Sequence, residues 1–304
     1  MAVTKVGRYL VERVVEVERP YAPAQDFFPD LTQDMLTTCL RELPGGQLTT
    51  DGRLQMSFHS FVVKTGRFTI LVDSCCGNDK ERPLRPGFHK MNNDFMGALA
   101  KAKVKPEEVD YVMCTHLHWD HVGWNTRLVD GVWKPTFPNA KYLMSKTEYE
   151  QADAVYRSGK KDTHTQAFED SIDPIVRAKQ AVLVADDYEV DKGMWIEPCH
   201  GHTPGNIVIN LESEGQRGVL TGDVIHHQIQ LRYPEMSTTA EGVENEAQRD
   251  FLRSIGCARF QGFFEHLELE MMVEAGLTPM QALVSATGTF WDTVVICALS
   301  GLVI

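Results

Sequence analysis

Residues 114–124, CTHLHWDHVGW, place three histidines and an aspartate within six positions. These residues are His116, His118, Asp120 and His121. Imidazoles and a carboxylate crowded together need polar partners, because burial without partners is energetically costly. A divalent metal would satisfy all of them at once, since imidazole nitrogen and carboxylate oxygen are common ligands of zinc. A surface cluster or a non-catalytic metal clip is the alternative, and the spacing favours a metal site.

Four further stretches carry polar residues of the same kinds. Each follows an apolar run that is typical of a strand, and the loops at strand ends are where a sheet gathers a functional site. The same side chains could also brace turns or hydrogen-bond to backbone. The stretches are CHGHTPG with His202, LTGDVIHH with Asp223, LVDSCCGN with Asp73 and FFEHLELE with His266.

Alternating and continuous apolar runs predict strands in both halves of the chain, with helices between them. Apolar spacing predicts a helix over residues 91–103, and the Ser145-Lys146-Thr147-Glu148 pattern of a capping box predicts the start of another. The expected strands lie in residues 56–66, 67–78, 110–116, 140–146, 181–185, 194–201, 206–213 and 217–223.

Composition narrows the classes of function. The chain has 304 residues and a net charge of −12, a field that would repel nucleic acid. Its opening residues lack the apolar core of a secretory signal, and its seven cysteines are an odd number, which favours reduced thiols and a cytoplasmic location. The final run TVVICALSGLVI is shorter than the roughly 20 residues of a membrane span. We therefore expect a buried element and no membrane partner, with a weak tail anchor as the alternative.

Taken together, the motifs resemble the metallo-β-lactamase fold superfamily. The HxHxDH signature is present at residues 116–121, and GHTPG and TGD follow in the expected order. The resemblance covers about residues 55–235 and is strongest to lactonases, methyl-parathion-type hydrolases and related esterase-like metallohydrolases. It implies an α/β fold, the αββα sandwich, in which two packed mixed β-sheets are flanked by helices and the metals lie at one edge between the sheets.

Carried over to this sequence, the resemblance implies two zinc ions per chain. Iron or manganese would suit the same nitrogen and oxygen donors. Three histidines would hold the first ion, an aspartate and two histidines the second, and one further aspartate would bridge them. The first set is His116, His118 and His202, the second is Asp120, His121 and His266, and the bridge is Asp223.

Two interpretations of His266 stay open. It could be the last metal ligand, or a histidine early in an amphipathic helix. The segment from Glu265 to Thr289 resembles a helical part of amidohydrolases of the imidazolonepropionase or prolidase type. We therefore divide the chain into an N-terminal lid or interface segment (residues 1–55), a catalytic domain (56–257) and an atypical helical C-terminal segment (258–304).

Several other residues are expected beside the metals. Asp73 would orient the metal-binding loop by hydrogen bonds. His226, His227 and Trp119 would line the pocket or contact the substrate, although loop histidines facing solvent and core aromatics are the alternatives. Trp119 is also part of an expected apolar wall with Trp124, Phe58 and Phe61.

The predicted function is a metal-dependent hydrolase in which a metal-bound hydroxide cleaves a small ester, lactone or organophosphate. Asp120 would be both a ligand and the group that passes a proton to the leaving group. The alternatives are a mononuclear iron enzyme similar to a persulfide dioxygenase, a β-lactamase-like enzyme, and a binding protein with an impaired site. The expected partners are a small-molecule substrate and, through the N-terminal or C-terminal segment, a second copy of the chain in a homodimer.

Overall fold

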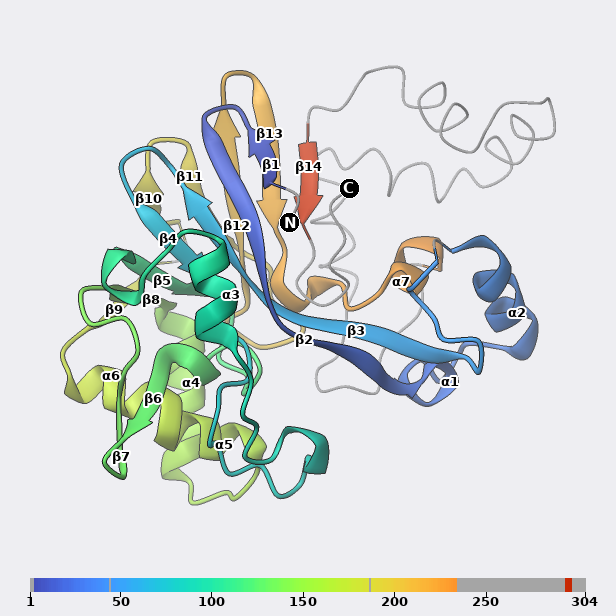
Figure 1. Cartoon of the computed structure of the whole chain (residues 1–304), viewed down its shortest axis with the longest axis horizontal. Helices are drawn as coiled ribbons and strands as arrows, with labels where there is room; N and C mark the ends of the chain where they lie inside the picture. The colour runs from blue at the N-terminus through green and yellow to red at the C-terminus, as the bar shows by residue number, and fades with distance from the viewer. Residues whose placement is uncertain (1–2, 44, 186, 234–292, 297–304) are drawn as a thin grey trace.

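A mixed sheet forms the larger layer of the molecule (Figure 1). The computed structural model describes residues 3–43, 45–185, 187–233 and 293–296, and within them this sheet has seven strands in the order β1-β2-β3-β4-β5-β8-β9. Pairing is antiparallel from β1 to β4 and parallel from β4 to β9. The strands are β1 (Val3–Val6), β2 (Tyr9–Pro23), β3 (Arg53–Lys64), β4 (Thr69–Val72), β5 (Tyr111–Cys114), β8 (Lys141–Ser145) and β9 (Ala181–Val184).

The second sheet has five strands within the described ranges, in the order β10-β11-β12-β13-β14. Strands β10 to β13 are antiparallel, and β14 pairs parallel to β13. These strands are β10 (Glu189–Asp191), β11 (Met194–Pro198), β12 (Ile207–Ser213), β13 (Gln216–Leu220) and β14 (Thr293–Ile296). A separate hairpin is formed by β6 (Thr126–Val129) and β7 (Val132–Pro135).

The two sheets pack face to face through a shared apolar core. Val63, Ile70 and Met113 of the larger sheet lie in one buried cluster with Ile196 and Ile209 of the smaller sheet. These residues alternate along their strands with side chains on the opposite face, as expected for a strand with one face toward this core. Each predicted strand overlaps an observed strand of one of the two sheets, so these predictions are confirmed.

Helices cover the outer face of the larger sheet. Phe95 and Leu99 of α3 share a second buried cluster with Val112 and Tyr142 of the sheet. The predicted α/β class with two packed sheets and flanking helices is thus confirmed. The α-helices are α1 (Ala24–Phe27), α2 (Gln33–Glu42), α3 (Phe95–Lys101), α4 (Lys146–Arg157), α5 (Thr163–Ala167), α6 (Asp173–Arg177) and α7 (Gln228–Arg232). Short helical turns are η1 (Pro86–Phe88), η2 (Pro106–Glu108), η3 (Gly123–Asn125), η4 (Phe168–Ile172) and η5 (Gly222–Val224).

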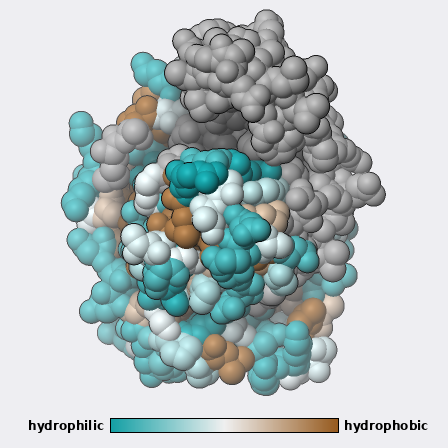
Figure 2. All heavy atoms as spheres, turned by 90° about the vertical axis from the view of Figure 1, so that its right-hand side faces the viewer, coloured by the Kyte–Doolittle hydropathy of each residue, from teal (hydrophilic) through white to brown (hydrophobic). Residues whose placement is uncertain are grey.

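The expected division of the chain can be compared with the observed strands at two places. The boundary near residue 55 falls inside β3, and the preceding β2 pairs with β3 along most of its length. Within the predicted helical C-terminal segment, Thr293–Ile296 form strand β14, and His266 lies outside the described residues. On the face shown in Figure 2, small apolar patches lie among hydrophilic residues. A lid or interface role for residues 1–55 stays a prediction. None of the helices in the described ranges is long and apolar enough to cross a membrane.

The ends of β4 and β5 carry the loops that matter for the site. Because these strands are parallel neighbours, Asp73 and Thr115 emerge at the same edge of the sheet. Gly123, just after the histidine cluster, donates its backbone N–H to the carbonyl oxygen of Cys75 at 2.7 Å. A Cβ atom on Gly123 would overlap the backbone carbonyl of Cys76. Only glycine lets the two loops approach this closely.

We therefore expect Gly123→Ala to lower the free energy of unfolding by about 3 kcal/mol, because two backbone segments would have to separate. Urea denaturation followed by tryptophan fluorescence measures the change. Gly45→Ala is the control, because a Cβ atom at Gly45 meets nothing within 4 Å. Equal stability of the two variants would contradict the close approach.

A buried group of charges joins the hairpin β6–β7 to the loop after β4. The Lys80 ammonium donates to the hydroxyl of Thr126 at 2.6 Å and to the carbonyl oxygen of Asp170 at 3.2 Å. The Arg82 guanidinium donates to both carboxylate oxygens of Asp170, at 2.6 and 3.0 Å. Lys80 is fully buried, and this burial lowers its pKa to about 7.

A pH dependence of stability follows from Lys80. Between pH 7 and 10.5 the unfolded chain binds a proton at Lys80 that the folded chain has released, so this group raises the free energy of unfolding as pH rises. We expect a slope of up to about 1.4 kcal/mol per pH unit. Urea titrations at pH 7, 8 and 9 should show this slope as the difference between the native protein and Lys80→Met. Parallel pH profiles of the two proteins would refute the assignment.

Candidate functional site

Asp73 holds the start of the histidine cluster in place. It follows β4 in a left-handed conformation, with φ of 55°, which aspartate tolerates better than most residues. Its carboxylate accepts hydrogen bonds from the backbone N–H of Thr115 at 2.8 Å and from the hydroxyl of Thr115 at 2.9 Å. It also accepts one from Nδ1 of His121 at 2.9 Å. This contact fixes the orientation of the His121 ring, so that its Nε2 faces the site.

The histidines of the two sheets meet at one point. His116, His118 and His121 lie in the loop after β5, and His202 lies in the loop between β11 and β12. Nδ1 of His118 and Nε2 of His202 are 2.9 Å apart. The ring of His116 lies 4.0 Å from that of His121 and 4.7 Å from that of His202, measured between centroids. The structure thus brings together residues that are distant in the sequence.

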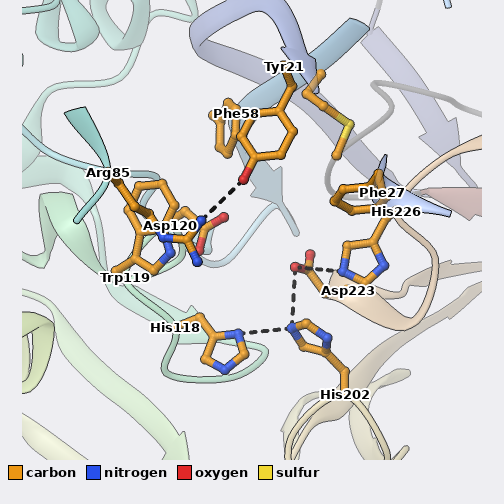
Figure 3. Close-up of a pocket in the computed structure, with 11 residues that line it drawn as sticks. Tyr21, Phe27, Phe58, Arg85, His118, Trp119, Asp120, His202, Asp223 and His226 are labelled. Carbon is orange, nitrogen blue, oxygen red and sulfur yellow. Dashed lines mark hydrogen bonds and ion pairs between the residues drawn. The ribbon is translucent and has the colours of Figure 1, made fainter. Parts of the chain in front are cut away.

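Asp223 lies close to these imidazoles, and Figure 3 shows it beside His202 and His226. It sits in η5, directly after β13, and its carboxylate oxygens are 3.1 Å from Nε2 of His121 and 3.9 Å from Nε2 of His116. Nε2 of His202 and Nε2 of His226 each lie 3.5 Å from Oδ2 of Asp223. Burial alone would raise the pKa of Asp223, but His121 and His226 outweigh it and hold that pKa well below its usual range.

The electrostatics of the site favour neutral imidazoles at two positions. Burial lowers the pKa of His116 and of His118 well below the usual value, so both rings are uncharged at neutral pH. The neutral ring is the form that binds a metal. At His121 burial acts in the same direction, but the carboxylates of Asp223 and Asp73 overcome it and raise the pKa.

Metal binding fits these residues on two grounds. Within the described part of the chain, Nε2 of His116 is buried and makes no hydrogen bond, and the Asp223 carboxylate lies 3.9 Å from it. Buried polar atoms without such partners are rare in folded proteins. Three groups also bring potential ligand atoms within 4.8 Å of one another: His116 with His118 and His202, His116 with His121 and Asp223, and His202 with Asp223 and His226.

Asp120 lies beside these groups, not inside them. It lines the same pocket, and Asp223 and the Arg85 guanidinium act on it electrostatically. Burial raises the pKa of Asp120, while His121 opposes that shift. Figure 3 shows Asp120 in the pocket wall beside Trp119 and Arg85.

A pocket opens over the histidines and holds about 380 Å³ of empty space, its open mouth included. Tyr21 of β2 and Phe27 of α1 contribute to its wall, so the N-terminal segment shapes the site. The Arg85 guanidinium donates to the Tyr21 hydroxyl at 3.2 Å and lies over the Trp119 ring. The lining residues are Tyr21, Phe27, Met56, Phe58, Arg85, His118, Trp119, Asp120, His202, Asp223 and His226.

The other expected pocket residues divide into two groups. Trp119, Phe58 and His226 line the pocket. By contrast, Phe61 packs between the sheets, and Trp124 stacks on Phe95 with ring centroids 5.2 Å apart.

The expectation for His227 needs correction. Its Nδ1 accepts from the backbone N–H of Ile229 and its Nε2 lies 2.9 Å from the carbonyl oxygen of Gln47, so it begins α7 and stays outside the described pocket lining.

Three residues of the site were missed by the sequence analysis. His164 of α5 lies against His118, with ring centroids 4.2 Å apart, and its THTQ context carries no spacing that predicts this. Arg85 enters the pocket from a loop without a motif. Glu148 was assigned only to a helix cap, but its carboxylate contacts the loops of both His118 and His202. No local signal shows this role, because the partners of Glu148 in these two loops are distant in the sequence.

Comparisons with known proteins agree with this geometry. The model of a family described as the metallo-β-lactamase superfamily matches residues 59–256, close to two thirds of the chain. An N-acyl homoserine lactonase of Bacillus thuringiensis is 28% identical over 126 residues, which is 41% of this chain and 42% of the lactonase. The aligned part thus spans about two fifths of this curated relative.

Two solved structures share the fold over almost the whole chain. A probable metal-dependent hydrolase from Staphylococcus aureus has a TM-score of 0.66 at 15% identity, covering 97% of this chain and 91% of its own. AidC, a dizinc quorum-quenching lactonase in complex with its product N-hexanoyl-L-homoserine, has a TM-score of 0.64 at 18% identity, covering 98% and 90%. At these identities the likeness concerns the fold alone.

The role of Asp73 gives a prediction for stability. In Asp73→Asn an amide N–H₂ would face either the N–H of Thr115 or that of His121, so one buried charged hydrogen bond is lost. We expect the free energy of unfolding of the metal-free protein to fall by about 2 kcal/mol in urea denaturation. Asp79→Asn is the matched control, because Asp79 is exposed but shares the left-handed backbone, with φ of 62°. A loss of equal size in both variants would count against the Asp73 contacts.

Proposed function

The chain belongs to the metallo-β-lactamase superfamily, and from this premise we propose that it is a hydrolase that uses two zinc ions to cleave a small ester, lactone or organophosphate. The observation that carries the proposal is the position of Asp223, whose carboxylate lies 3.1 to 3.9 Å from the Nε2 atoms of His121 and His116. A carboxylate surrounded by imidazoles from both sheets is the arrangement that a bridging ligand requires.

We assign the first ion to His116, His118 and His202. Two ligands of one tetrahedral zinc ion lie about 3.4 Å apart, given zinc–ligand distances near 2.1 Å. The 3.5 Å between Nε2 of His202 and Oδ2 of Asp223 suits this separation. All donors are nitrogen or oxygen, which favours zinc and also admits iron or manganese. Together with the shared carboxylate of Asp223, these histidines would offer the first ion four protein donors.

We assign the second ion to Asp120 and His121, with Asp223 shared between both ions. For the last ligand two histidines are alternatives. His226 already lies 3.5 Å from Oδ2 of Asp223, and His266 is the residue that the family resemblance favours. The support for a second position is the group of His116, His121 and Asp223, whose potential ligand atoms lie within 4.8 Å of one another.

The residues of the pocket define the proposed chemistry. When bound, such ions supply a nucleophilic hydroxide at neutral pH and polarise the carbonyl or phosphoryl oxygen of the substrate. Asp120, which faces the pocket, would hold the proton and pass it to the leaving group. The aromatic wall of Phe27, Phe58 and Trp119 would exclude water from the apolar part of the substrate.

The comparisons favour a lactone among these substrates. The Bacillus thuringiensis relative is named for hydrolysis of N-acyl homoserine lactone, and the structural neighbour AidC holds N-hexanoyl-L-homoserine as its product. The pocket of this chain combines an apolar wall with the Arg85 guanidinium and the Tyr21 hydroxyl. Such a pocket suits a ligand with an apolar chain and a polar amide or ester group.

Metal analysis tests the proposal first. We expect two zinc equivalents per chain by elemental mass spectrometry, and at most one in His202→Ala, since His202 contributes to the first position. His200→Ala should keep two equivalents, because His200 is exposed. Removal of metal with a chelator should abolish hydrolysis of N-hexanoyl homoserine lactone, a nitrophenyl ester or a phosphotriester, and zinc should restore it.

The same measurement separates the alternatives. Loss of one equivalent in His226→Ala, but not in His266→Ala, would assign the last ligand to His226, and the reverse result would assign it to His266. One equivalent of iron in the native protein would favour the redox alternative. A native protein that binds two metals and hydrolyses none of the three substrates would leave the fold and site in place and overturn the proposed reaction.

A further inference from the structure

Glu148 occupies the first turn of α4, where the sequence pattern assigns it to a helix cap. The Ser145 hydroxyl does accept a hydrogen bond from the backbone N–H of Glu148, at 3.4 Å, so the cap is present. The carboxylate of Glu148, however, turns away from Ser145. It is buried, with 5% of the residue exposed, and it points toward the two loops that carry the histidines.

Three donors converge on this carboxylate from two loops. Oε1 accepts a hydrogen bond from the backbone N–H of Leu117 at 3.0 Å. Oε2 accepts one from the Thr203 hydroxyl at 2.7 Å and one from the backbone N–H of Gly205 at 3.0 Å. Leu117 lies between His116 and His118, and Thr203 directly follows His202. One side chain therefore holds both loops.

The packing around Glu148 leaves little freedom for these loops. A Cβ atom on Gly205 would overlap the backbone nitrogen of Glu148, so the His202 loop rests directly on the first turn of α4. Burial raises the pKa of Glu148, and the hydrogen bonds from Leu117, Thr203 and Gly205 oppose that shift. Hydrogen bonds to a buried carboxylate are stronger than those between neutral groups, and each one fixes the position of its donor.

The two loops meet again at their imidazoles. Nδ1 of His118 lies 2.9 Å from Nε2 of His202, one residue away from the donors that Glu148 holds. We infer that Glu148 is a positioning residue that sets the separation of His118 and His202 and thereby the affinity of the first metal position. This inference rests on the proposed function, because it assigns both histidines to one ion.

A positioning role and a purely structural role of Glu148 predict different results for metal affinity. A residue that only stabilises α4 would change the free energy of unfolding and leave the metal affinity of the folded protein unchanged. A positioning residue would change the metal affinity of the folded protein at one of the two positions. Groups that orient metal ligands typically change metal affinity or activity by about 10–100-fold when they are substituted.

Glu148→Gln is the first variant. Its amide keeps one oxygen to accept from Thr203 and Gly205, but it turns an N–H₂ group toward the N–H of Leu117. We expect zinc affinity at one position to fall by about 10–100-fold in competition with a chromophoric chelator. Glu150→Gln is the matched control on the same helix, because Glu150 is exposed and lies 3.7 Å from the ammonium of Lys146, one turn away. Urea denaturation of the metal-free proteins shows whether each variant is folded.

Thr203→Val provides a second, independent variant. It removes a single donor to Glu148 and keeps the shape of the side chain, so it also serves if Glu148→Gln fails to fold. We expect a several-fold loss of zinc affinity at the same position. In the double variant Glu148→Gln/Thr203→Val the losses should be less than additive, because both substitutions act on the same side chain. Once the carboxylate has lost its charge, removal of the Thr203 hydroxyl removes a weaker hydrogen bond.

The outcomes separate this inference from the proposed function. A native protein with two zinc positions, together with unchanged affinity in folded Glu148→Gln, would overturn the inference alone. Fully additive losses in the double variant would do the same. A native protein that binds no zinc would overturn the proposed function and the inference with it.

Discussion

His121 lies between two buried carboxylates, and this contact joins the two sheets at the edge where the site is built. Asp73 belongs to the end of β4 in the larger sheet and accepts from Nδ1 of His121, whereas Asp223 follows β13 in the smaller sheet and lies 3.1 Å from Nε2. His121 thus gives each of these buried carboxylates a polar partner, and burial without partners would be costly. The histidine loop, the sheet packing and the position of the remaining imidazoles all depend on this arrangement.

Much of the fold and of the histidine cluster could be predicted, because their signals are local. Alternating apolar residues predicted β3, and the spacing of His116, His118 and His121 predicted a shared site before any contact was known. Roles that depend on distant partners could not be predicted in this way. Glu148 contacts Leu117, 31 positions away, and Gly205, 57 positions away, so its neighbours in the sequence show only the helix cap.

The sequence also could not show which of two nearby residues of the same type lines the pocket. His226 and His227 follow each other in the sequence, yet His226 lines the pocket and His227 begins α7. The same limit applies to the aromatic residues, because Phe58 faces the pocket while Phe61, three positions later in the same strand, packs between the sheets. Residue type predicts that such side chains are buried, but the direction of each one is set by the pairing of the strands.

The contact of Gly205 with the first turn of α4 bears on how this site could be rebuilt. Loop exchange between relatives is a common way to change the selectivity of an enzyme. Here the segment that carries His202 has no room for any side chain at position 205, and its neighbour at position 203 must present a hydroxyl to Glu148. The His202 loop and the helix it rests on therefore form one transplantable module, and a designer who exchanges the loop would have to carry the helix start with it.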